Sequence, residues 1–129
     1  MTQFGPNNAT MEVRNGPLLG PVLSRVIGML AARAQCPIDR LDDALLVADT
    51  VAAHSPDHSL NGTVIVGLQA DEGLLELTVG DLRPQGAADL LRDAELPGVG
   101  NVLERVADQV EVRPDGEGEQ LYIRLGFSA

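Results

Sequence analysis

Residues 39–55, DRLDDALLVADTVAAHS, form the stretch from which the fold can be worked out. Apolar residues recur in it at spacings of three and four, which places them on one face of a helix about four turns long. Asp39 is a good N-cap, and the negative charges of Asp42 and Asp43 suit the first turn, where the helix dipole favours them. The residues of this buried face are Leu41, Ala44, Leu45, Ala48, Val51 and Ala52.

A second feature of this helix is the flank beside its apolar face. Asp42, Leu46, Asp49 and Ala53 fall on it, and Asp49 and Ala53 are one turn apart. These two side chains therefore project the same way. Whether the protein is an enzyme depends largely on what this flank carries.

The rest of the chain predicts two hairpins and further helices around this one. Pro21 suits the first turn of a helix over 22–35, which Cys36 and Pro37 end. Strands come in adjacent pairs, which favours an α+β two-layer sandwich with a mixed, mostly antiparallel sheet and helices on one face. The predicted hairpins are 63–69 with 74–79 and 109–113 with 120–125, and the other predicted helices are 87–93 and 100–107.

Length and composition indicate one domain. The chain has 129 residues, and we expect a disordered tail over 1–10, then a single domain over 11–126 that starts with a short edge strand at 11–15. The single cysteine, Cys36, excludes an internal disulfide and fits a reducing compartment. With no secretory signal or apolar run of membrane-spanning length, we expect a cytoplasmic protein.

The net charge of −10 narrows the possible partners. An acidic surface repels a nucleic-acid backbone and an anionic bilayer, so we expect neither as a partner. Such acidity often serves only solubility, and its functional interpretation is a basic partner protein.

Few residues have the surroundings that catalysis needs. Asp81 follows a strand in VGDLRP and could accept a hydrogen bond from a base amino group, although such aspartates often only cap turns. Gly98 and Gly100 precede a helix, where glycines let a phosphate approach backbone N–H groups or merely form a flexible joint. His54 and His58 have a chelating spacing, but Pro56 interrupts the helix and no third ligand is evident.

The order of these motifs resembles the anti-sigma regulatory factors, which are serine-protein kinases of the histidine-kinase-like ATPase superfamily. The likeness covers roughly residues 14–125, and its most specific part is PGVGNVLERVADQVEV, followed by DGEGEQLYI. It implies the histidine-kinase-like ATPase fold, ATP and Mg²⁺ as cofactors, and a sigma factor or an anti-anti-sigma protein as partner. It also implies a homodimer.

The resemblance assigns roles along the helix of residues 39–55. Asp49 stands where the family has the glutamate that acts as general base, so it is the catalytic candidate. Ala53 stands where the family has the asparagine that holds magnesium. A methyl group cannot ligate a hard cation, and without the metal the phosphoryl oxygens lose their main stabiliser. We therefore expect the ATP and Mg²⁺ chemistry to be impaired.

The other nucleotide-binding positions are partly altered. Asp81 matches the adenine-contacting aspartate, but Arg83 replaces a glycine two residues later. Gly98 and Gly100 match the second glycine box. In that box Asn101 replaces a leucine. Further along the chain, Gly118 and Glu119 stand where the family has a terminal Gly-Thr pair, which would put a carboxylate near the phosphates.

Three functions are consistent with these residues. The first is an anti-sigma-like regulator that acts by binding a partner and has lost the kinase chemistry. The second is an active ATP-dependent serine-protein kinase whose metal is held by other groups, such as Asp49 or Asp57. The third is an unrelated α+β protein-interaction module.

Overall fold

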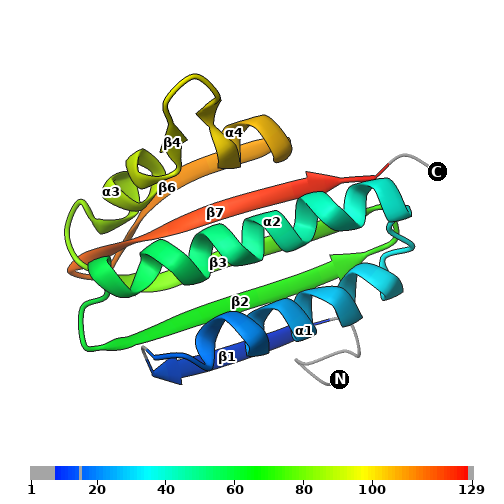
Figure 1. Cartoon of the computed structure of the whole chain (residues 1–129). Helices are drawn as coiled ribbons and strands as arrows, with labels where there is room; N and C mark the ends of the chain where they lie inside the picture. Colours follow the sequence, from blue (N-terminus) through cyan, green and yellow to red (C-terminus); the bar gives the residue numbers. More distant parts are fainter. Residues whose placement is uncertain (1–7, 15, 128–129) are drawn as a thin grey trace.

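A computed structural model describes residues 8–14 and 16–127 as an α+β protein, with helices packed against a five-stranded sheet (Figure 1). The elements follow in the order predicted from sequence, with two short strands and a 3₁₀ helix added. They are β1 (Asn8–Arg14), α1 (Leu19–Arg33), α2 (Ile38–His54), the 3₁₀ helix η1 (Ser55–His58), β2 (Thr63–Asp71), β3 (Leu74–Leu82), α3 (Gly86–Asp93), β4 (Glu95–Leu96), β5 (Gly100–Asn101), α4 (Val102–Val106), β6 (Gln109–Asp115) and β7 (Gly118–Gly126).

The large sheet has the strand order β1-β2-β3-β7-β6, and β4 and β5 form a separate small hairpin. Both predicted long hairpins are confirmed. Every described pairing is antiparallel, so the prediction of a mixed sheet was wrong. Alternate residues of β2 and β3 are buried, as a sheet with one covered face requires. Val66 lies opposite Val79 and Leu68 opposite Leu77, as the apolar alternation predicted.

α1 and α2 lie side by side over the same face of this sheet (Figure 1). The buried face of α2 consists of Ala44, Val47, Ala48 and Val51. The predicted face is therefore rotated slightly about the helix axis from the observed one, because it did not include Val47, which is buried. Leu45 and Ala52 are only half-buried, and Ala52 meets Gly20 of α1.

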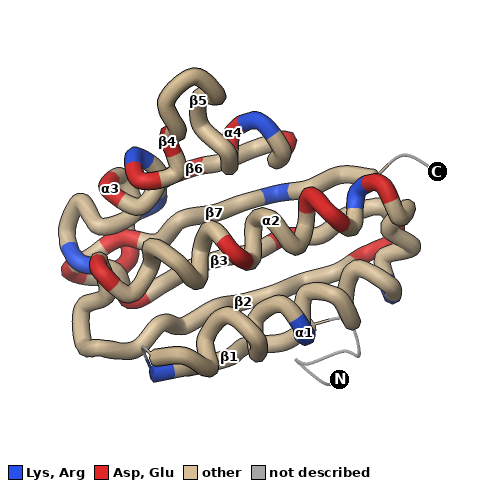
Figure 2. The backbone as a smooth tube through the Cα atoms, viewed as in Figure 1, with Lys and Arg blue, Asp and Glu red and all other residues tan. Residues whose placement is uncertain are grey.

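The predicted cap of α2 was also wrong. The helix begins at Ile38 after Pro37, whose backbone is extended, and no side chain caps it. Asp39 lies inside the first turn, where its charge still favours the helix dipole. Figure 2 shows the acidic segments spread along α2, whose four aspartates are Asp39, Asp42, Asp43 and Asp49.

The N-terminal strand is longer than predicted. β1 begins at Asn8, because Asn8, Ala9 and Thr10 pair with Gln69, Leu68 and Gly67 of β2. These three residues belong to the sheet and not to a disordered tail. The rest of the predicted tail, 1–7, lies outside the described residues, as does Asn15 at the end of the predicted edge strand.

The helices between the two hairpins are short. The predicted helix 87–93 is confirmed as α3, whereas the predicted helix 100–107 is reduced to α4, five residues long. β4 and β5 occupy the residues before α4. Within residues 8–14 and 16–127, no helix has the length and apolar character needed to cross a membrane.

Candidate functional site

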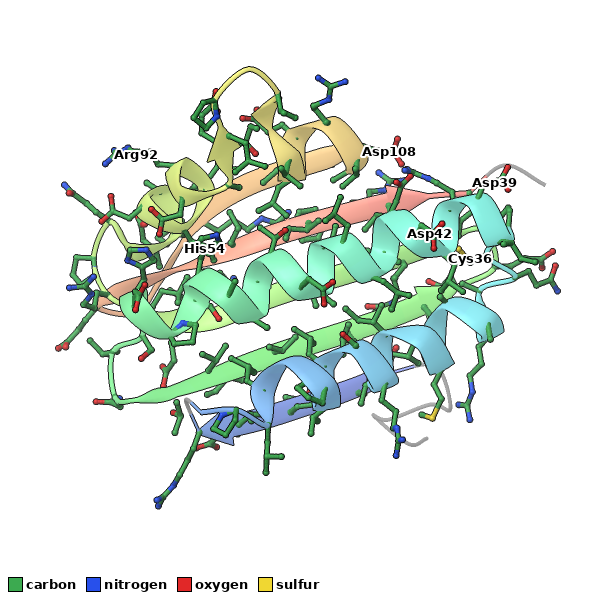
Figure 3. All side chains as sticks on the ribbon, viewed as in Figure 1. Cys36, Asp39, Asp42, His54, Arg92 and Asp108 are labelled. Atoms are coloured by element: carbon green, nitrogen blue, oxygen red, sulfur yellow. The ribbon has the colours of Figure 1, made fainter. Side chains whose placement is uncertain are left out.

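Asp49 and Ala53 of α2 are both exposed. Asp49 accepts a hydrogen bond from the Ser24 hydroxyl of α1 at 3.4 Å, so its carboxylate points toward α1. Ala53 follows one turn later on the outer side of the helix. Figure 3 shows His54 at the end of α2 nearest α3 and Asp39 at the opposite end. The flank singled out from sequence therefore faces α1 and solvent rather than α3.

Asp81 sits in an irregular segment at the end of β3. The register with β7 shifts between Val79 and Leu82, and Asp81 has a φ of 60°. This bulge buries Leu82 completely and places Asp81 beside Asp115 in a groove of about 220 Å³. Thr78 of β3 and Gly67 of β2 also line the groove and alternate with buried residues, so the groove lies on the sheet face away from α1 and α2.

Arg83 contacts η1. Its Nη2 donates to the carbonyl of Asp57 at 3.0 Å and lies 3.2 Å from Nδ1 of His58. Because a guanidinium can only donate, Nδ1 must accept, and the ring proton is on Nε2. That nitrogen donates to Oδ2 of Asp93 on α3 at 2.6 Å. His58 thus ties η1 to α3.

This arrangement leaves neither ring nitrogen of His58 available for a metal. His58 is buried, and both nitrogens have protein partners. Among the described residues, no group of three or more histidine, cysteine or acidic side chains is arranged to hold a metal ion. Nearby, the buried Ser55 hydroxyl has no hydrogen-bond partner among those residues.

The N-terminus of α3 is occupied by a carboxylate of the same chain. Oε1 of Glu119 accepts hydrogen bonds from the backbone N–H groups of Ala87 and Ala88, at 3.1 Å and 3.4 Å. Glu119 comes from β7 and pairs with Leu82 across the sheet. A negative charge there complements the helix dipole and satisfies two N–H groups that would otherwise lack partners. These N–H groups are therefore not available to a phosphate.

Gly118 has a steric role. A Cβ atom at this position would lie 1.9 Å from the carbonyl oxygen of Leu82. No side chain fits between these two strands without moving the backbone. The glycine is explained by this close approach, and its placement requires no ligand.

Gly98 lies in the turn between β4 and β5, and Gly100 is the first residue of β5; their φ values of 78° and 96° favour glycine. The next residue, Asn101, caps α4 by accepting from the N–H of Glu104 at 3.1 Å. Its Nδ2 donates to the carbonyl of Leu91 in α3 at 2.7 Å. The residues that the resemblance matched to a second glycine box thus form a turn and a short strand, and Asn101 joins α4 to α3.

Two clusters had no signal in the sequence. The first is centred on Arg40, which joins α2 to the ends of α4 and β7. Arg40 donates to the carbonyls of Val106 and Gly126, and it forms ion pairs with Asp43 and Asp108. An arginine in a first helical turn resembles any surface charge until the distant carbonyls are placed beside it.

The second cluster surrounds Tyr122 on the open sheet face. Its hydroxyl donates to Glu76, and the Arg113 guanidinium lies 3.9 Å from the ring centroid. Burial raises the pKa of this tyrosine above 10.0, and the Glu76 hydrogen bond adds to the increase. These side chains border a groove of about 390 Å³ that also includes Gly67 and Thr78.

The eight candidate positions fall into three groups: Asp49 and Ala53 on α2, Asp81 and Arg83 with Gly118 packed against the backbone between β3 and α3, and Gly98, Gly100 and Asn101 around β5. Asp81 alone among them lines either of these two grooves. No family model matches the sequence, and no curated protein matches it. The motif order and the geometry above are the basis for a functional proposal.

Proposed function

We propose that the chain is a noncatalytic regulator of the anti-sigma type, which acts by binding a sigma factor or an anti-anti-sigma protein. The element order supports the histidine-kinase-like ATPase fold that the motifs suggest: a strand, two helices, a hairpin, shorter helices and a second hairpin. α2 lies on the sheet, and the segment after it bonds to the end of β3, where the Leu60 N–H donates to the Asp81 carbonyl at 2.7 Å.

The observation that carries the noncatalytic part is the position of Glu119. Its carboxylate accepts from two N–H groups at the start of α3. A triphosphate placed there would have to displace this carboxylate and would then lie beside its charge. Like charges at close range in a partly buried site are strongly unfavourable.

The remaining residues do not fit a magnesium–ATP complex either. Ala53 offers a methyl group where the resemblance requires a metal ligand, and Asp49 is engaged with α1. The side chain of Asp81 lies in a groove of the sheet face that α1 and α2 leave open. We therefore derive no phosphoryl-transfer step for this chain.

The direct test is a binding panel. The purified chain would be tested by biolayer interferometry against every sigma factor and anti-anti-sigma protein of its source genome, with and without Mg²⁺-ATP. We expect binding to at least one member, with equal affinity in both conditions. Binding to none would refute the regulatory proposal.

Intact-mass analysis of each mixture tests the kinase alternative. We expect no phosphate on any member of the panel after incubation with Mg²⁺-ATP. A serine phosphate that requires this chain would instead establish the active kinase.

A further inference from the structure

One flank of α1 is apolar and exposed. Ser24 bonds to Asp49 and Gly20 packs against Ala52, so these positions define the side of α1 that faces α2. On the opposite flank of α1, four residues at spacings of four, three and four share one face of the helix. Met29 is 54% exposed and Val22 is 38% exposed. The flank consists of Val22, Val26, Met29 and Arg33, and exposed Leu18 extends it at the start of the helix.

The flank lies beside a free sheet edge. β1 is an end strand that pairs only with β2 among the described strands, and α1 lies over the same end of the sheet (Figure 1). Seven consecutive residues of β1 pair in register, without a bulge or a proline. Half of the backbone N–H and C=O groups of such a strand point outward, so they can pair with another strand. The other end strand, β6, contains Pro114, which cannot donate such a bond.

The charge of this surface differs from that of the whole chain. α1 contains Arg25 and Arg33 and no acidic residue, whereas the chain carries a net charge of −10 (Figure 2). Arg14 lies at the end of β1, where Glu12 is the one acidic residue. None of these three arginines forms an ion pair with another residue of 8–14 or 16–127.

The sign of this charge selects the partner. Carboxylates of an acidic segment would complement Arg25 and Arg33 of α1, whereas a second copy of the chain would bring arginines toward arginines. Val22, Arg25, Met29 and Arg33 alternate apolar and basic side chains along α1, which favours an extended segment whose residues facing α1 alternate apolar and acidic. The surface therefore fits an acidic, aliphatic strand.

We propose that an acidic, aliphatic segment of a partner protein adds to the free edge of β1 as a sixth strand. On the side that faces α1, its apolar residues pack on Val22 and Met29, and the acidic residues between them meet Arg25 and Arg33. This inference rests on the proposed function, because it names the surface by which the regulator holds its partner.

The experiment measures binding of a fluorescein-labelled eight-residue peptide, Val-Thr-Glu-Thr-Val-Thr-Glu-Thr, to the full chain by anisotropy. Its valines and glutamates all lie on one face when the peptide is extended. The same peptide with lysine in place of glutamate is the charge control. Val22→Glu, Met29→Glu and Arg25→Glu test the surface, and Leu46→Glu, at a residue 41% exposed on α2, is the matched control. Circular dichroism confirms that each variant is folded, and hydrogen exchange locates the peptide.

We expect saturable binding of the acidic peptide, no binding of the lysine peptide and slower exchange of the β1 amides. Each of the three surface variants should weaken binding at least tenfold, and Leu46→Glu should leave it unchanged. No binding at millimolar peptide, or equal weakening by Leu46→Glu, would overturn the proposal. So would light scattering that shows a dimer of the chain alone which Val22→Glu dissociates, because a second copy would then occupy the edge.

The two proposals can fail separately. If a panel member binds but Val22→Glu and Arg25→Glu do not weaken that binding, the regulatory function stands and this surface is wrong. If no panel member binds but the acidic peptide binds as expected, the surface stands and the anti-sigma assignment is wrong.

Discussion

Gly118→Ala offers a sharp test of whether this glycine is structural. The added Cβ would lie 1.9 Å from the Leu82 carbonyl oxygen, whereas ordinary contacts begin at about 3.5 Å, so β3 and β7 would have to separate locally by roughly 1.5 Å. Overpacking of this kind costs about 1–3 kcal/mol, and backbone cannot rotate away as a side chain can. We expect a loss near 3 kcal/mol, or about 10 °C in Tm for a domain of this size.

Gly28→Ala is the matched control. Gly28 lies inside α1, and nothing is within 4 Å of the Cβ that alanine would add. Alanine has the higher helix propensity, so this variant should gain about 0.5–1 kcal/mol. Chemical denaturation of both variants, followed by circular dichroism, gives the two free energies of unfolding. If Gly118→Ala unfolds at the wild-type denaturant concentration, the steric explanation fails and a ligand role for this glycine returns.

Three further predictions concern single side chains. Arg40→Ala should lower the free energy of unfolding by about 2–3 kcal/mol in urea, because it removes bonds to two carbonyls and two carboxylates. Arg92→Ala, which removes one exposed ion pair, should change it by less than about 0.5 kcal/mol, and equal effects would show that the Arg40 contacts do not stabilise the fold. The raised pKa of Tyr122 means that the folded state holds the phenol proton more tightly, so its contribution is complete below pH 10 and is lost as pH rises through the folded-state pKa. Tyr122→Phe should therefore flatten the fall in Tm above pH 10, and an unchanged fall would show that other groups cause it. Ala53→Asn alone should yield no kinase activity in a phosphate-transfer assay, because Glu119 still occupies α3; activity in this single variant would count against the noncatalytic proposal.

The fold was largely predictable because local patterns and burial agree in it. Alternation in β2 and β3 identified the buried residues and their partners across the hairpin. Helix ends were less certain, since α2 uses Pro37 rather than Asp39 at its start and the β4–β5 hairpin shortens α4. Both boundaries are set by backbone hydrogen bonds and pairing within a few residues, which the apolar periodicity does not report.

The candidate site was harder to predict because the direction in which its side chains point depends on small rotations of the backbone. The bulge between Val79 and Leu82 decides which face of the sheet Asp81 points to, and the sequence VGDLRP does not encode it in any simple way. In the same way, the unfavourable carboxylate of Glu119 was noticed from sequence, but its partners on α3 were not. Sequence identified the residue, and only the assembled fold showed that it fills an anion-binding position.

Calorimetric titration of Mg²⁺-ATP into the full chain tests the central claim most directly. Because Glu119 occupies the α3 N–H groups and Ala53 offers no metal ligand, we predict no saturable heat at nucleotide concentrations up to several millimolar, a range in which about 4 kcal/mol of binding free energy would be seen. Saturable, magnesium-dependent binding heat, despite Ala53 and Glu119, would contradict the account.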